Sequence, residues 1–226
     1  MAQNLVKPKQ LFIVGGGSSI KESLPQLWQK INNRFVIGIN YSYHHFKNPT
    51  FHVYLDKNFY KDNKEALDKL PLIITKPLKN LPSNVIQLKT ITSYNRDVRK
   101  GAYKGSLSGI YALSLAIYLL DEGEIFLLGY DFCGIGKDNK GRAKTHYYEN
   151  IEHRGRGKIN YYGTKGRADR DFGVYKNEKK CKIYNVSLQS QINVFPKISY
   201  TQFFEMINNE TFNQDELRKY IKERLK

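Results

Sequence analysis

The sequence predicts an α/β domain, with a Rossmann-like, mostly parallel sheet, helices on both faces and an inserted basic lid. Two observations predict this fold class. Short apolar segments alternate along the chain with longer segments in which apolar residues recur at helical spacing. The first apolar segment, residues 11–14, runs directly into three consecutive glycines, as a buried strand does when it enters a tight strand-to-helix turn.

Seven segments are predicted to be strands because each is short and apolar. They are residues 11–14, 35–40, 51–55, 72–75, 85–88, 124–131 and 182–186. Helical spacing predicts helices over residues 20–31, 106–120, 200–207 and 214–225. Ser106 or Ser108 is the expected cap of the second helix, and Asn213 or Asp215 that of the last. Because strands that alternate with helices pair in parallel, ligands are expected at the carboxyl ends of these strands.

The composition limits the class of protein. A chain of 226 residues fits one domain, and 40% hydrophobic residues can build a core. The sequence contains no run of about 18 apolar residues, and its first ten residues are polar. Two cysteines, Cys133 and Cys181, fit a reducing compartment. We therefore expect a cytoplasmic protein.

The charge is concentrated in one part of the chain. Residues 137–182 contain fourteen Lys or Arg and six Asp or Glu, a net charge of +8 out of +16 for the whole chain. This segment has no clear apolar period and is rich in tyrosine. We expect a nucleotide-binding core over residues 1–136, a basic, Tyr-rich lid over 137–181, and a return strand with C-terminal helices over 182–226.

The glycine turn and the helix that follows it are the first candidate site. Glycines let backbone N–H groups approach a phosphate, and a helix N-terminus adds further donors. The spacing matches neither the dinucleotide fingerprint nor the P-loop. The turn thus predicts a phosphate-bearing ligand of another kind, or a tight turn without a ligand. Its residues are Gly15, Gly16, Gly17, Ser18 and Ser19.

Four segments together resemble a known family. Residues 15–22 are similar to the glycine loop of the bacterial sialyltransferases of glycosyltransferase family 42, and residues 38–40 to its second strand. Residues 106–117 resemble its Ser-Gly helix start, and residues 124–132 the strand that ends Gly-x-Asp-Phe. Related loops occur in 6-hydroxymethylpterin diphosphokinase-like proteins and in phage proteins with the same core.

This resemblance implies a nucleotide sugar donor, bound at the carboxyl edge. Separately, we expect transfer without a metal. Gly15, Gly17, Ser19, Asn40, Ser108 and Gly109 would line the donor site, together with Gly16 and Ser18 of the same turn. Asp131 ends the last strand of this edge. It is either a ligand contact or a buried acid that accepts backbone N–H bonds.

The lid supplies the candidates for catalysis and for contacts with the acceptor. The resemblance implies a lid histidine as general base, since the pKa of histidine lies near working pH. His146 is the first candidate and His153 the second, and Tyr147 and Tyr148 could hydrogen-bond the departing phosphate. The sequence near these four residues also contains cations, which can bind phosphates, and aromatic residues, which can stack on bases. These are Arg142, Lys144, Arg154, Arg156, Tyr161 and Tyr162.

The leading hypothesis is a glycosyltransferase that acts on an acceptor hydroxyl, and the net charge of +16 makes DNA, RNA or another polyanion a candidate acceptor. One alternative is a pyrophosphokinase that needs Mg²⁺, for which Asp56 and Asp131 are candidate contacts. Another is a phage-type nucleic-acid-binding protein without catalysis, in which the lid is a nucleic-acid groove. The lid could also be a solvated loop with no ligand.

Overall fold

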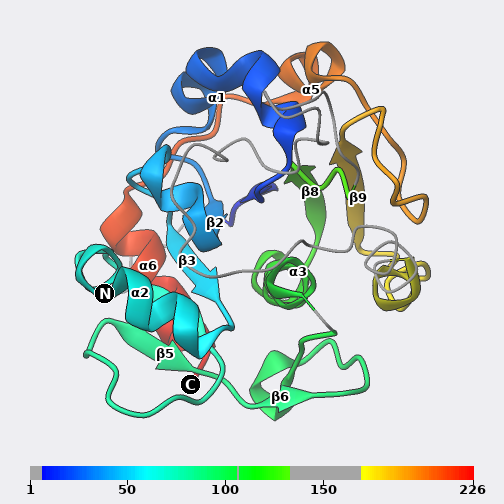
Figure 1. Ribbon diagram of the computed structural model, residues 1–226. Coiled ribbons are helices and arrows are strands. Elements are labelled where there is room, and N and C mark those ends of the chain that lie inside the picture. The colour runs from blue at the N-terminus through cyan, green and yellow to red at the C-terminus, as the bar shows by residue number, and fades with distance from the viewer. Residues whose placement is uncertain (1–6, 106, 133–168) are drawn as a thin grey trace, which may run out of the picture.

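The computed structural model describes residues 7–105, 107–132 and 169–226. Seven parallel strands form the main sheet in the order β5-β4-β3-β2-β1-β8-β9 (Figure 1). Together with its helices, this sheet confirms the predicted Rossmann-like α/β class. The strands are β1 (Gln10–Val14), β2 (Val36–Ile39), β3 (Phe51–Tyr54), β4 (Ile73–Thr75), β5 (Val85–Gln87), β8 (Gly123–Leu128) and β9 (Cys181–Val186).

The strand order reverses between β1 and β8. From β1 the chain builds outward through β2 to β5, and it then returns to the other side of β1 to add β8 and β9. Val14, the last residue of β1, is therefore paired with Gly38 of β2 on one side and Leu128 of β8 on the other. In open α/β sheets, ligands bind at the carboxyl ends of the strands beside such a reversal.

Helices cover both faces of the sheet because its strands are apolar on both sides. On one face, α1 (Leu24–Ile31) and α5 (Tyr200–Met206) pack against Phe12 and Val14, and α2 (Lys57–Leu67) packs against the end of β3. On the other face, α3 (Ser108–Leu120) packs against Leu11 and Ile13. Thirteen residues of α3 are almost all apolar, which fits a helix with protein on every side.

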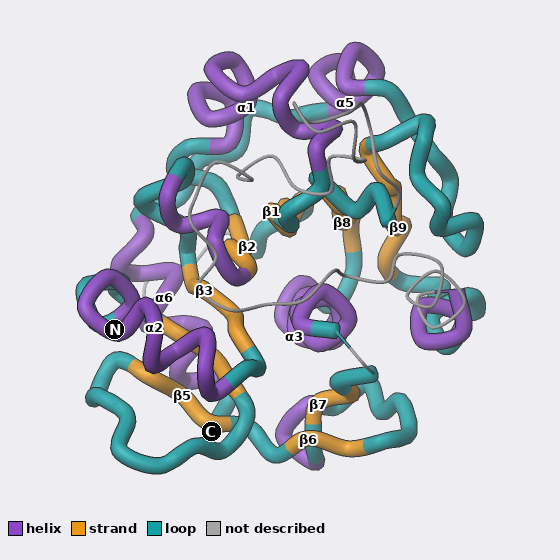
Figure 2. The backbone as a smooth tube through the Cα atoms, viewed as in Figure 1, coloured by secondary structure: helices purple, strands orange, loops and turns teal. Residues whose placement is uncertain are grey.

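A small second sheet lies on the outer side of α3. Its strands are β6 (Thr90–Ile91) and β7 (Ala102–Tyr103), which pair in parallel. Figure 2 shows both strands beside α3, on the side away from the main sheet. The short η3 (Val98–Lys100) connects them. As a result, α3 is enclosed between two sheets.

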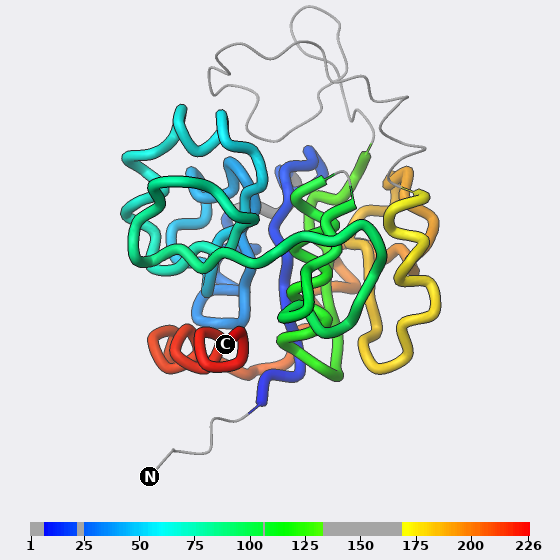
Figure 3. Tube along the Cα trace, turned by 90° about the horizontal axis from the view of Figure 1, so that it is seen from below, coloured from blue at the N-terminus to red at the C-terminus, as the bar shows by residue number. Residues whose placement is uncertain are grey.

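The C-terminal helix α6 (Gln214–Arg224) lies at the amino ends of the strands, opposite the candidate site (Figure 3). The Gln214 side chain donates to the Arg34 carbonyl, just before β2, at 3.0 Å. The Arg218 guanidinium donates to the Thr50 carbonyl, just before β3, at 3.0 Å. Asn213 caps this helix, as one of the two predicted caps.

Three local predictions need correction. The helix predicted over residues 20–31 begins as the 3-10 helix η1 (Ser18–Ser23), and α1 starts only at Leu24. The N-cap of α3 is Leu107, so Ser108 is the first residue of the helix and not its cap, while Ser106 lies outside the described residues. The sequence analysis also missed α2, because Asn63 interrupts its helical geometry and few of its residues are apolar.

Two aromatic residues assigned to the lid belong to the core. Phe172 is fully buried and Tyr175 is 2% exposed, and both pack in the cluster that contains α3. The Tyr175 hydroxyl donates to the Ile110 carbonyl at 3.1 Å. The described part of the expected lid, from Asp169 onward, is thus part of the folded core. Among the described residues, none of the helices has the length and apolar character that a membrane span requires.

Candidate functional site

The glycine turn after β1 is fixed to the segment after β8. The Gly15 N–H donates to the Leu128 carbonyl and the Gly17 N–H to the Gly129 carbonyl, both at 2.8 Å. The Ser19 N–H donates to Asp131 Oδ2 at 2.8 Å. Every second N–H of the turn therefore points at β8. Gly16 lies between the two glycines that make these bonds, and Ser18 begins the 3-10 helix η1.

This contact explains two of the three glycines. A Cβ on Gly15 would lie 2.9 Å from the Gly129 carbonyl oxygen. A Cβ on Gly17 would lie 2.5 Å from Asp131 Oδ2 and 2.6 Å from the Gly129 oxygen. These glycines are needed for close packing against β8 and the residues that follow it, whether or not a phosphate binds at the turn.

Asp131 is a buried acid that holds the turn. It is 1% exposed, and its Oδ1 accepts a second bond from the Ser19 hydroxyl at 2.5 Å. Burial raises the pKa of this carboxyl, and hydrogen bonds from Ser19 and Ser187 oppose the rise. Of the two interpretations open at the sequence level, the contacts in the structure are those of a buried acid bonded to the backbone.

Ser18 differs from its neighbour Ser19. Its side chain is buried, 6% exposed, and its Oγ has no hydrogen-bond partner. Buried polar atoms are nearly always hydrogen-bonded, so an unpartnered hydroxyl beside a ligand-binding edge indicates a missing ligand or water. The Ser18 hydroxyl is therefore the candidate ligand contact within the turn.

The start of α3 reaches the same edge through Tyr130. The Tyr130 hydroxyl donates to the Gly109 carbonyl at 3.1 Å, and a Cβ on Gly109 would lie 3.0 Å from the Tyr130 ring. Tyr130 precedes Asp131, so one short segment contacts both the glycine turn and α3. Because α3 has no side-chain cap and no acid in its first turn, its positive end is available to an anion.

Asn40 follows β2, the neighbour of β1, and begins the 3-10 helix η2 (Asn40–His44). Its φ of 48° lies in the left-handed region, which asparagine tolerates better than most residues. Two residues earlier, Gly38 leaves room for a buried polar pair, since a Cβ there would lie 2.8 Å from both His52 Nδ1 and Ser42 Oγ. The sequence analysis missed this pair.

His52 lies in β3, is fully buried, and has no hydrogen-bond partner of ordinary geometry at either ring nitrogen. Burial lowers its pKa to about 3, and the nearby Asn40 backbone opposes this shift. The unfolded chain therefore binds a proton near pH 6.5 that the folded chain does not bind. We expect the free energy of unfolding to decrease as the pH is lowered from about 6.5 toward 3. His52 should account for a loss of about 2 kcal/mol by pH 5.

Urea unfolding at pH 7 and pH 5 checks this expectation, with His52→Gln as the comparison. The glutamine does not titrate, so the variant should lose less stability between the two pH values than the wild type does. Equal losses in both proteins would show that His52 does not cause the dependence.

The structure brings some of the predicted site residues together and leaves others outside its described range. Ser19 bonds to Asp131, and Gly15 and Gly17 bond to the backbone of residues 128 and 129. Gly109 contacts Tyr130, and Asn40 follows the adjacent strand. The predicted catalytic and acceptor residues of the lid all lie outside the described residues. These are Arg142, Lys144, His146, Tyr147, Tyr148, His153, Arg154, Arg156, Tyr161 and Tyr162.

The candidate Mg²⁺ ligands of the alternative function are already engaged. Asp56 caps α2 by accepting from the N–H groups of Asn58 at 2.8 Å and Phe59 at 3.3 Å. Asp131 holds Ser19 as described above. A metal at either carboxylate would compete with these backbone bonds.

The fold and the edge described here define a Rossmann-like α/β domain with a candidate ligand site at its strand reversal. Among solved structures, it is similar to the MAf glycosyltransferase from Magnetospirillum magneticum AMB-1, with a TM-score of 0.58 and 12% sequence identity. The similarity covers 98% of this chain and 38% of the other, so this chain spans about two-fifths of that protein's length. No protein-family model and no curated protein matches the sequence. The likeness shows a fold that a glycosyltransferase also has.

Proposed function

We propose that this protein is a glycosyltransferase that binds a nucleotide-activated sugar at the carboxyl edge of its sheet. The observation that carries the proposal is the glycine turn, which is fixed to β8 and the residues after it and in which the buried Ser18 hydroxyl has no hydrogen-bond partner. The fold shared with the MAf glycosyltransferase supports it. So does the resemblance of four segments to the family 42 sialyltransferases.

The donor phosphate would lie on the β2 side of the turn. The Gly16 N–H and the Ser18 hydroxyl would donate to it, and Asn40 would contact the nucleotide from the end of β2. Ser108 and Gly109 would add the positive end of α3. Preorganised donors of this kind stabilise a leaving phosphate without a metal.

A lid histidine would complete the reaction, with His146 ahead of His153. It would take the proton of an acceptor hydroxyl while the oxygen attacks the anomeric carbon, and the bond to the phosphate oxygen breaks. Tyr147 or Tyr148 would hydrogen-bond the departing phosphate. The alternative of a pyrophosphokinase is weakened because both of its candidate Mg²⁺ ligands already hold backbone groups.

The direct test is hydrolysis of a panel of nucleotide sugars, with monophosphate and diphosphate donors, in the presence and absence of EDTA. We expect one donor to be turned over without a metal. His146→Ala should lower the turnover number about 100-fold or more and leave the affinity for the free nucleotide unchanged. Absence of turnover with every donor, together with binding of ATP, would refute the proposal. Full activity of His146→Ala would refute the role of His146.

A further inference from the structure

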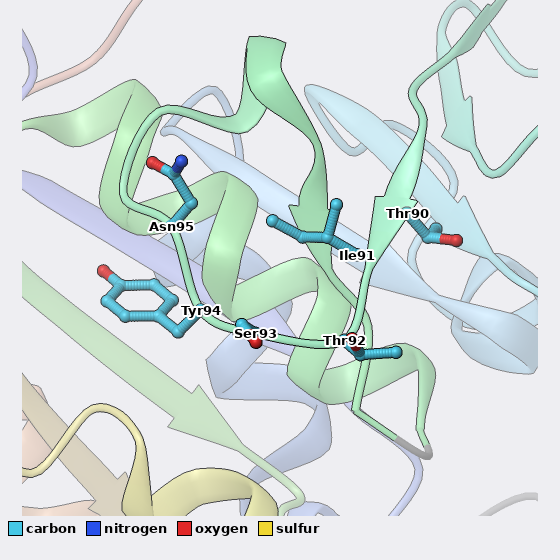
Figure 4. Close-up of a pocket in the computed structure, with 6 residues that line it drawn as sticks. All are labelled: Thr90, Ile91, Thr92, Ser93, Tyr94 and Asn95. Carbon is cyan, nitrogen blue, oxygen red and sulfur yellow. The ribbon is translucent and has the colours of Figure 1, made fainter.

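Two open surface hollows with mixed polar and apolar linings lie along the small sheet outside α3, and we call them the groove. Its wider part, of about 520 Å³, is lined by consecutive residues from Thr90 to Asn95 (Figure 4). Its second part, of about 260 Å³, is lined by Ile91, Thr92, Tyr103, Lys104, Gly105, Arg170 and Asp171. The two parts share the lining residues Ile91 and Thr92, so they lie next to each other.

Asp171 lies at the inner end of this groove. It is 4% exposed, and a Cβ on Gly105 would lie 2.9 Å from its Oδ2. Arg170, whose side chain is 71% exposed, donates from Nε to Asp171 Oδ1 at 3.2 Å. Burial raises the pKa of the Tyr103 hydroxyl, the negative charge of Asp171 adds to this rise, and Arg170 opposes it. A carboxylate, a guanidinium and a phenol therefore meet where the groove ends.

This end of the groove is adjacent to the candidate donor site. Gly105 lies two residues before Leu107, the N-cap of α3, and the start of α3 contacts Tyr130. Phe172, the residue after Asp171, packs against the rings of Tyr130 and Phe132 with centroids 5.9 and 5.8 Å apart. Tyr130, which links the glycine turn to α3, thus also packs against the residue next to Asp171.

The lining favours a carbohydrate over a nucleic acid. Thr90, Thr92, Ser93 and Asn95 offer neutral hydroxyl and amide groups, which can both donate and accept hydrogen bonds. A carboxylate accepts strong hydrogen bonds from sugar hydroxyls but repels a phosphate. Arg170 is already paired with that carboxylate, so a phosphodiester would have to compete for it.

We infer that this groove is the acceptor site, and that it takes a neutral carbohydrate whose hydroxyl groups are bound by Asp171 next to the donor. This inference rests on the proposed transferase function. In it, Asp171 is a specificity residue that holds the acceptor. The wider part of the groove would hold the remainder of the carbohydrate chain.

The test is saturation-transfer NMR on the full chain with four neutral disaccharides, lactose, maltose, cellobiose and chitobiose. We expect at least one to bind the wild type, and Asp171→Asn to weaken that binding about tenfold. Thr92→Val, an exposed change in both parts of the groove, should weaken it by a smaller factor and keep the fold. The matched control is Asp62→Asn, an exposed aspartate on α2, which should bind as the wild type does.

Two results would overturn the inference. One is the absence of binding by all four disaccharides, or binding that neither Asp171→Asn nor Thr92→Val changes. The other is displacement of the disaccharide by a deoxythymidine octanucleotide, which would assign the groove to a polyanion. Donor hydrolysis separates this inference from the proposed function, because water can accept the sugar without the groove. Donor hydrolysis without disaccharide binding would refute only the assignment of the groove as the acceptor site. Disaccharide binding without donor hydrolysis would refute only the proposed transferase function.

Discussion

Gly17→Ala is expected to lose stability and nucleotide binding together. The new methyl group would lie 2.5 Å from Asp131 Oδ2 and 2.6 Å from the Gly129 oxygen, closer than real Cβ contacts allow. The turn must therefore move away from β8, and the bonds of Gly17 and Ser19 to that segment would break. We expect a loss of about 3 kcal/mol in the free energy of unfolding.

Urea unfolding measures this loss, and titration with the nucleotide of the hydrolysed donor measures binding. Gly173→Ala is the matched control, because a Cβ there would meet nothing within 4 Å. That variant should stay within about 0.5 kcal/mol of the wild type. A Gly17→Ala protein as stable as Gly173→Ala would show that the turn does not depend on its contact with β8.

Asp131→Ala is expected to have the second large effect. It removes the acceptor of both the Ser19 N–H and the Ser19 hydroxyl from a site that is 1% exposed. Two buried donors would then lack partners, which we expect to cost about 2–4 kcal/mol. Asp131→Asn should cost less, because the amide oxygen still accepts one of the two bonds.

Ser18→Ala is the control in the same turn. Its hydroxyl has no partner in the folded chain, so its removal should leave the free energy of unfolding nearly unchanged. Nucleotide affinity should nevertheless fall, since this hydroxyl is assigned to the donor phosphate. If Ser18→Ala destabilised the fold as much as Asp131→Ala, the assignment of Ser19 to the fold and of Ser18 to the donor phosphate would be wrong.

The sheet was predictable because its signals are local. Residues 11–14 and 125–128 are apolar runs that are each followed by a glycine, and each lies in an inner parallel strand of the sheet. The helix α2 was missed because its buried side chains, among them Phe59 and Tyr60, depend on contacts with Tyr54 that the sequence does not display. Tyr175 and Phe172 were assigned to the lid for the same reason, since only the fold places them against α3.

The candidate site was predictable in its location but not in its details. The glycines marked the edge, yet their pattern could not show that alternate N–H groups are bonded to β8. Asp171 and the groove beside it have no local motif, because Gly105 and Asp171 come together only through tertiary packing.

The bond between Ser19 and Asp131 joins residues 112 positions apart in the chain. Such a contact closes a long loop, so in folding it forms only after β8 has docked on β1. A nascent or partly folded chain with β1 to β5 in place would still lack a fixed glycine turn. Nucleotide binding should therefore appear late in refolding, with the final cooperative step, and stopped-flow fluorescence with a labelled nucleotide would time that step.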